Sequence, residues 1–218
     1  MRALLLTAIS LVLATPAAAH AETIGHSVQG RPIILTRVGD PQAARRILVV
    51  GCIHGDEPAG RGIVEDLKRA TPAPDTQLLL VEDLNPDGFA HHTRQNAHGV
   101  DLNRNSSEHW AGAGAHPWSE PETRAIRRLI LRERPTLTIY YHQPFGLVDV
   151  PEGGHPQLAR RYAELTGLPI KRLSRRHGSL SRWQNVRIDP GSAIVVELAP
   201  GPLPRALRLR HVAAVLAM

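Results

Sequence analysis

The 218-residue chain contains one cysteine, Cys52, and few aromatic side chains, 4% of its residues. A single cysteine excludes an internal disulfide framework and any zinc site built on several thiolates, so histidine and carboxylate side chains would have to hold a metal. The scarcity of aromatic residues argues against a stacking surface for single-stranded nucleic acid. Lysine and arginine outnumber acidic residues by 26 to 20, and the resulting net charge of +6 favours an anionic partner.

The N-terminus carries an apolar stretch that is too short to span a bilayer. The stretch covers residues 3–13, Arg2 precedes it, and small residues at A-x-A spacing follow it. This order is typical of a secretory signal peptide, although a buried N-terminal helix would fit the same residues. We therefore expect residues 1–21 to be a signal, cleaved after Ala19 or Ala21, and residues 22–218 to form one domain. A secreted or periplasmic protein without a transmembrane anchor would meet cell-wall material rather than nucleic acid.

The rest of the chain alternates apolar runs with helical patterns, which predicts a single α/β domain with a mostly parallel or mixed twisted sheet flanked by helices. Two segments, 83–116 and 171–187, are expected to be largely irregular. The expected strands are 32–38, 46–51, 77–82, 136–141 and 192–198. The expected helices are 58–70, a helix opened by a capping box at Ser119 and Glu122, 157–166, and a C-terminal helix after Pro204 that packs through Leu209, Val212, Ala213 and Leu216.

Polar side chains follow three of these apolar strands. His54 and Glu57 come just after one strand, His142 follows another, and Glu197 lies near the end of the last. In open α/β sheets ligands bind beyond the carboxyl ends of the strands, so these four residues could meet at one edge.

Two histidines and one glutamate form the ligand set of catalytic zinc, with a fourth position open for water. Gly55 would allow the tight turn that aims His54 and Glu57 at one cation. The pair H-x-x-E is weak evidence alone, since a surface turn with an ion-paired glutamate has the same residues. Eight further histidines are expected to lie in turns or on the surface: His91, His92, His98, His109, His116, His155, His177 and His211.

Glu197 is the candidate general base because it is flanked by Val195, Val196 and Leu198. A carboxylate in such a strand is costly to bury unless it is paired or lines a cavity. An edge strand with Glu197 turned toward water is the alternative.

A long polar motif, Arg94 to Asn105 (RQNAHGVDLNRN), lies between the candidate ligands. Arginine binds a carboxylate through two parallel hydrogen bonds, and a neighbouring asparagine adds a donor. Together with HGDEPAG, NPDG, YHQP and the strand ending VVEL, this order of motifs resembles the zinc metallocarboxypeptidases of the carboxypeptidase A/B type. The short chain and the HGDE turn most resemble their murein peptide amidase branch.

The resemblance implies a zinc carboxypeptidase-like fold and one Zn²⁺ per chain, held by His54, Glu57 and His142. It further implies that Glu197 is the general base and proton shuttle and that Arg94 polarises the scissile carbonyl. Asn103 and Arg104 would bind the free carboxylate of the departing amino acid. Residues 179–185 would form part of the pocket wall. The mobile tyrosine of the digestive members has no counterpart, since residues 172–189 contain no tyrosine.

The function expected from these residues is hydrolysis of an amide bond next to a free carboxylate, in a peptide or murein-peptide substrate. One alternative is an N-acyl amino acid deacylase of the succinylglutamate desuccinylase or aspartoacylase type. The other is a non-catalytic envelope-binding module with the same fold. The basic run Lys171, Arg172, Arg175 and Arg176 could attract an anionic substrate or form a solvated loop.

Overall fold

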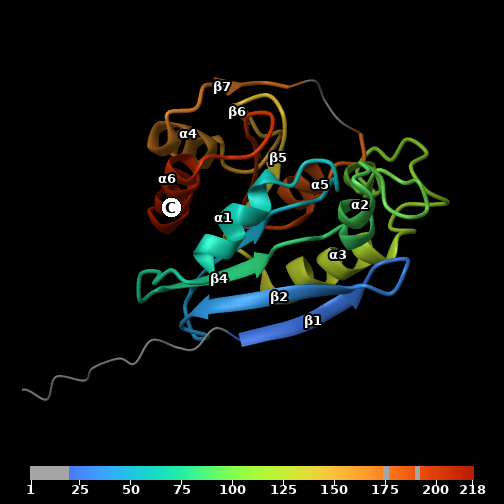
Figure 1. Ribbon diagram of the computed structural model, residues 1–218, viewed down its shortest axis with the longest axis horizontal. Helices are drawn as coiled ribbons and strands as arrows, with labels where there is room; N and C mark the ends of the chain where they lie inside the picture. Colours follow the sequence, from blue (N-terminus) through green and yellow to red (C-terminus); the bar gives the residue numbers. More distant parts are fainter. Residues whose placement is uncertain (1–19, 174–176, 190–191) are drawn as a thin grey trace, which may run out of the picture.

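The structure is a computed structural model, which describes residues 20–173, 177–189 and 192–218 (Figure 1). The predicted signal peptide lies outside this range except for His20 and Ala21, which open the first strand. In chain order the elements are β1 (His20–His26), β2 (Pro32–Gly39), β3 (Arg45–Val50), α1 (Ala59–Leu67), β4 (Thr76–Val81), α2 (Pro86–His91), the 3₁₀ turn η1 (Leu102–Arg104), α3 (Pro121–Glu133), β5 (Leu137–His142), β6 (Leu147–Asp149), α4 (Pro156–Thr166), β7 (Ile170–Lys171), α5 (Leu180–Arg187), β8 (Ser192–Glu197) and α6 (Arg205–Leu216).

One mixed sheet of eight strands, in the order β1-β2-β4-β3-β5-β8-β6-β7, organises the described residues. Its four central strands, β4, β3, β5 and β8, run parallel to one another. The strands β1, β2 and β6 join by antiparallel pairing, and β7 lies parallel to β6. The predicted α/β class and mixed sheet are therefore confirmed.

The central strands are apolar on both faces because each face is covered by helices. In β3, Ile47 and Val49 belong to a core shared with α1, α4 and α6, whereas Leu48 and Val50 belong to a core shared with α3 and α5. All four side chains are buried. The two-residue period of the strand thus feeds two separate hydrophobic layers.

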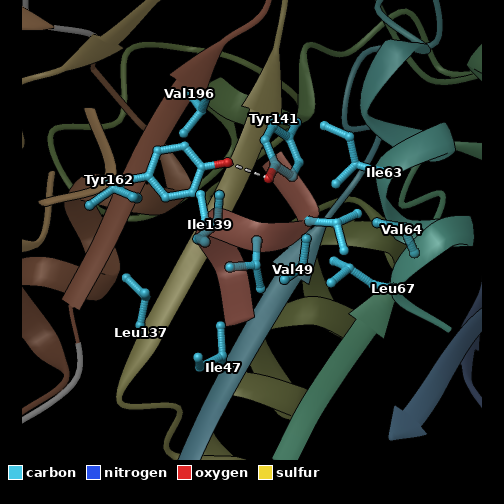
Figure 2. Packing of buried hydrophobic residues seen from close by; sticks show 14 of the residues in the cluster. Ile47, Val49, Ile63, Val64, Leu67, Leu137, Ile139, Tyr141, Tyr162 and Val196 are labelled. Atoms are coloured by element: carbon cyan, nitrogen blue, oxygen red, sulfur yellow. Dashed lines mark hydrogen bonds between the residues drawn. The ribbon is translucent and has the colours of Figure 1, made fainter. Parts of the chain in front are cut away.

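The first layer contains a buried polar chain (Figure 2). The hydroxyl groups of Tyr141 on β5 and Tyr162 on α4 are 2.6 Å apart, and Tyr162 also bonds His211 Nδ1 on α6 at 2.8 Å. These partners satisfy groups that would otherwise be costly to bury. His211 is therefore a core residue, and its expected place in a turn or on the surface is wrong.

Several boundaries and packing faces differ from the prediction. Helix α3 begins at Pro121 after Glu120, without a side-chain cap, because Ser119 Oγ bonds Glu120 and Glu122 Oε1 accepts the Val28 N–H at 3.0 Å. The predicted capping box is therefore wrong, since both side chains serve other partners.

The two segments expected to be irregular contain short helices, α2 and η1 in the first and α5 in the second. Helix α6 packs through His211, Val212, Ala214 and Val215, whereas Leu209 and Ala213 are exposed. No helix within the described residues is both long enough and apolar enough to span a membrane.

Candidate active site

The carboxyl ends of β3, β5 and β8 bring the four predicted residues together. His54 and Glu57 lie in the turn after β3, and His142 and Glu197 are register partners at the ends of the adjacent parallel strands β5 and β8. All four are at least 92% buried, with His54 at 1% exposure and Glu57 at 8%. Because β8 is an interior strand, the alternative of an edge strand with Glu197 in water does not hold.

The three candidate ligands converge on one point. Nδ1 of His54 lies 3.1 Å from Nδ1 of His142, and each of these nitrogens lies 2.9 Å from Glu57 Oε2. Tetrahedral zinc with bonds of about 2.05 Å would place its ligand atoms about 3.3 Å apart, close to this triangle. The donor set and its spacing therefore fit a zinc ion.

Glycines make the ligand turn possible. A Cβ on Gly55 would lie 1.9 Å from the backbone carbon of Gly88 in α2, so the turn packs directly on that backbone. A Cβ on Gly60 would similarly lie 2.3 Å from the carbonyl oxygen of Gly51. Only glycine permits these approaches, which place His54 and Glu57 beside β5.

Asp101 supports the site from behind, a role that the sequence did not reveal. Its Oδ1 lies 3.0 Å from His54 Nε2 and accepts the Asn103 N–H at 2.9 Å, and its Oδ2 accepts from Arg94 Nε at 3.1 Å. A carboxylate on the outer ring nitrogen fixes the tautomer that leaves Nδ1 free to bind a metal. In the sequence, Asp101 is marked only by its position in the motif GVDLN. Neither its charge nor its spacing from the candidate ligands predicted a role for it.

The ionisation of these carboxylates suits metal binding, since ligands must be deprotonated. Burial alone would raise the pKa of Glu57, but hydrogen bonds from His142 and His54 hold it well below its usual range. Burial likewise opposes the ionised form of Asp101, and the bond to His54 outweighs it and lowers the pKa. Burial lowers the pKa of His142, which favours the neutral imidazole.

Glu197 is electrostatically different from Glu57. Burial, together with the negative charge of Glu57, raises the pKa of Glu197 to about 7. Its Oε2 is buried and has no hydrogen-bond partner among the described residues. A carboxyl group of this kind can take up or release a proton near neutral pH.

Arg94, Asn103 and Arg104 lie in the same cleft, which has a volume of about 640 Å³. The Arg94 guanidinium donates to Glu57 Oε1 at 2.6 Å and remains about one-third exposed. Asn103 Oδ1 accepts the N–H of Leu180, the first residue of α5, and Arg104 donates to the Asn103 carbonyl. The structure thus brings all seven predicted site residues to one cleft.

The cleft also contains residues that the sequence did not single out. Gln143 joins the ligand strand to its surroundings: its N–H donates to Glu57 Oε2, its Oε1 accepts the Ala59 N–H, and its Nε2 donates to the carbonyls of Ala199 and Gly201. Phe145 lies at the cleft with 57% of its surface exposed. Gln143 stands in the motif YHQP without an assigned role, and Phe145 carries no pattern that could have identified it.

The segment between 171 and 187 has a more specific structure than predicted. Of the predicted wall segment 179–185, Ser179 and Ser181 line the cleft. Trp183 packs instead against Trp118 in the second core, with ring centroids 4.8 Å apart. Arg175 and Arg176 of the predicted basic run lie outside the described residues.

The sequence profile of the zinc carboxypeptidases matches residues 7–165. The chain belongs to this family. A murein peptide amidase A from Vibrio campbellii is 31% identical over 217 residues, covering 88% of this chain and 86% of the relative. A murein peptide amidase A from Escherichia coli K12 is also 31% identical, over 170 residues that cover 68% of this chain and 69% of the relative.

Solved structures of the family share the fold. The murein-tripeptide amidase from Escherichia coli O157 superimposes with a TM-score of 0.75 at 26% identity, covering 90% of each chain. Bovine thrombin-activatable fibrinolysis inhibitor, in complex with a tick carboxypeptidase inhibitor, gives a TM-score of 0.75 at 17% identity over 92% of this chain and 87% of that one. The protein is therefore a zinc-carboxypeptidase-type hydrolase acting on peptide or amide bonds.

Proposed function

We propose that this chain is an exported, zinc-dependent amidase that releases the carboxy-terminal residue from murein peptides. The observation that carries the proposal is the convergence of His54, Glu57 and His142 beside Glu197, in a cleft that also contains donors for a carboxylate. The murein peptide amidases among its relatives support the substrate class.

The proposed roles follow from position and charge. Zinc, when bound by His54, Glu57 and His142, supplies a Lewis acid that polarises the carbonyl and lowers the pKa of water. Glu197 accepts the proton of the attacking water and passes it to the nitrogen of the leaving amine, since its pKa lies near 7. Arg94 donates hydrogen bonds to the carbonyl oxygen as negative charge develops there.

Asn103 and Arg104 bind the free carboxylate of the departing residue. Arginine suits this role because its planar guanidinium can form two parallel bonds to a carboxylate. Asn103 Oδ1 is held by the N–H of Leu180 and its Nδ2 lies 3.4 Å from His142 Nε2, so the second hydrogen of this amide nitrogen can serve the substrate. Binding at this point orients the scissile amide toward Glu197 and Arg94.

The substrate class can be tested by incubating the zinc-loaded protein with a murein tripeptide and, separately, with N-succinyl and N-acetyl amino acids. We expect release of the terminal residue from the tripeptide, detected by mass spectrometry, and little release from the acyl amino acids. The reverse preference would support the deacylase alternative, which the comparisons do not favour. Pelleting with purified cell wall without hydrolysis of any substrate would support the binding module.

Export is the second part of the proposal. Cleavage after Ala19 would keep all described residues of β1, whereas cleavage after Ala21 would remove His20 and Ala21, which pair with Arg37 and Thr36 of β2. We therefore favour Ala19 as the last residue of the signal. The intact mass of the mature protein, recovered from a periplasmic or extracellular fraction, tests this choice, and a full-length mass would contradict export.

A further inference from the structure

Helix α3 presents a strongly basic face to solvent. Its inner side belongs to the second core, which also contains residues of α5. The side chains on its outer side are exposed: Arg124, Arg127, Arg128, Leu131 and Arg132. Because residues three and four positions apart are neighbours on a helix, these side chains form one surface, which we call the arginine face.

The first half of the arginine face has no compensating carboxylate. Arg127 and Arg128 form no ion pair with any other described residue, and Arg124 donates to backbone carbonyls of the turn before the helix. Glu120 and Glu122, which lie at the helix start, are buried, with exposures of 3% and 0%. Like charges three and four positions apart on a helix repel one another, so an anionic partner at this surface would be stabilising.

The centre of the arginine face is apolar. Leu131 lies one turn after the unpaired arginines and is 44% exposed. Beyond it, Arg132 is paired with Glu22 and Glu133, so the uncompensated charge ends at this point. An exposed leucine next to cationic side chains suits the boundary between lipid headgroups and acyl chains, where basic amphipathic helices lie.

The arginine face is separate from the catalytic cleft. Within the described residues, none of its side chains lines the cleft or the smaller cavities. Helix α3 covers the face of the sheet opposite α1, α4 and α6, whereas the cleft lies at the carboxyl ends of the strands. A partner bound to the arginine face would therefore leave the residues of the cleft uncovered.

We propose that the arginine face docks the protein on a bilayer that contains anionic phospholipids. The guanidinium groups bind headgroup phosphates, and Leu131 reaches the edge of the acyl chains. Each basic side chain near such a surface raises the affinity roughly 5-fold. A bilayer fits this face better than a nucleic acid, because a leucine rather than a stacking aromatic ring lies at its centre. The inference goes beyond the proposed function and involves no residue of the cleft.

The test is cosedimentation of the zinc-loaded protein with two kinds of vesicle. One contains phosphatidylcholine alone, and the other contains equal parts of phosphatidylcholine and phosphatidylglycerol. The protein begins at His20, because the apolar stretch 3–13 could bind vesicles by itself and the described helices and strands lie within residues 20–218. We expect binding to the anionic vesicles, little binding to the zwitterionic ones, and release at high salt, which screens exposed charges.

Two pairs of neighbouring arginines separate the arginine face from the net charge. Replacing Arg127 and Arg128 by glutamine should weaken binding to the anionic vesicles about 30-fold, whereas lysine at both positions should retain most of it. Arg160 and Arg161 are the matched control, because they are exposed on α4, on the other side of the sheet. Glutamine at these positions removes the same charge and should weaken binding less than about 3-fold.

Leu131 distinguishes a bilayer from a soluble polyanion. Leu131→Ser should weaken vesicle binding about 3- to 10-fold, since less than half of this leucine is available for burial in lipid. Leu209→Ser, which replaces a leucine of similar exposure on α6, should leave binding unchanged. Melting temperatures close to wild type show that folded proteins are compared.

Three results would overturn the proposal. The first is a wild-type protein that does not prefer anionic vesicles, and the second is an equal loss of binding in the two glutamine pairs. The third is unchanged vesicle binding by Leu131→Ser together with tighter binding of wild-type protein to a DNA duplex at equal phosphate concentration. That third result would assign the arginine face to a soluble polyanion.

Discussion

Replacing Asp101 by asparagine should weaken zinc binding while leaving the fold intact. Asp101 bonds His54 Nε2, Arg94 Nε and the Asn103 N–H at 3.0, 3.1 and 2.9 Å. Asparagine keeps one carbonyl oxygen for His54 and Asn103 but turns an amide donor toward Arg94, and it removes the negative charge that stabilises the imidazole. A carboxylate behind a ligating histidine typically contributes 10- to 100-fold in metal affinity, or about 1.4 to 2.7 kcal/mol.

The assay is competition for zinc against a chromophoric chelator, at a pH where both proteins are fully folded. Asp149→Asn is the matched control, because Asp149 lines the same cleft and bonds the Leu173 N–H rather than a candidate ligand. We expect the zinc dissociation constant of Asp101→Asn to rise about 10- to 100-fold and that of the control to stay close to wild type. An unchanged constant in Asp101→Asn would refute the argument that Asp101 positions His54.

Two other perturbations have equally defined outcomes. Burial lowers the pKa of His211 from 6.5 to about 4. As the pH drops, His211 is therefore protonated in the unfolded chain before it is protonated in the folded protein. The free energy of unfolding of the wild-type protein should fall by up to about 3 kcal/mol between pH 6.5 and pH 4. His211→Gln should lack this part of the pH dependence in urea denaturation, and identical slopes would contradict the assignment. Gly55→Ala places a Cβ 1.9 Å from the Gly88 backbone and should cost about 1 to 3 kcal/mol or more and weaken zinc binding. Gly62→Ala, whose Cβ meets only the flexible Arg208 side chain, should be tolerated in both assays, and equal loss in the two variants would count against the packing argument.

The buried strands could be predicted because a strand that is covered on both faces consists mainly of apolar residues. Strands β3, β5 and β8 are covered on both faces and therefore appear as continuous apolar runs in the sequence. The edge strand β1 is largely exposed and polar, and β6 and β7 contain three and two residues, so neither periodicity nor length marks them. Helix α5 was missed because a short, arginine-containing segment resembles a loop unless its packing partner is known.

The sequence could predict those site residues whose own side chains can bind a metal or transfer a proton. His54, Glu57, His142 and Glu197 follow or end buried strands, which suffices to place them at one edge of the sheet. The bond of Asp101 to the ring of His54, and the bonds of the Gln143 side chain to backbone groups, join segments that are far apart in the sequence. Such relations depend on three-dimensional contacts between residues 47 to 84 positions apart, which no local pattern encodes.

The central claim is that a zinc site and Glu197 together hydrolyse a murein peptide. The most direct measurement is mass spectrometry of the products from a murein tripeptide, for wild-type protein and Glu197→Gln, each shown to bind one zinc per chain. The account predicts that wild-type protein releases the terminal residue, that a chelator abolishes release, and that Glu197→Gln retains zinc but loses about 100- to 10,000-fold in rate. Undiminished release by Glu197→Gln, or by chelator-treated wild-type protein, would contradict it.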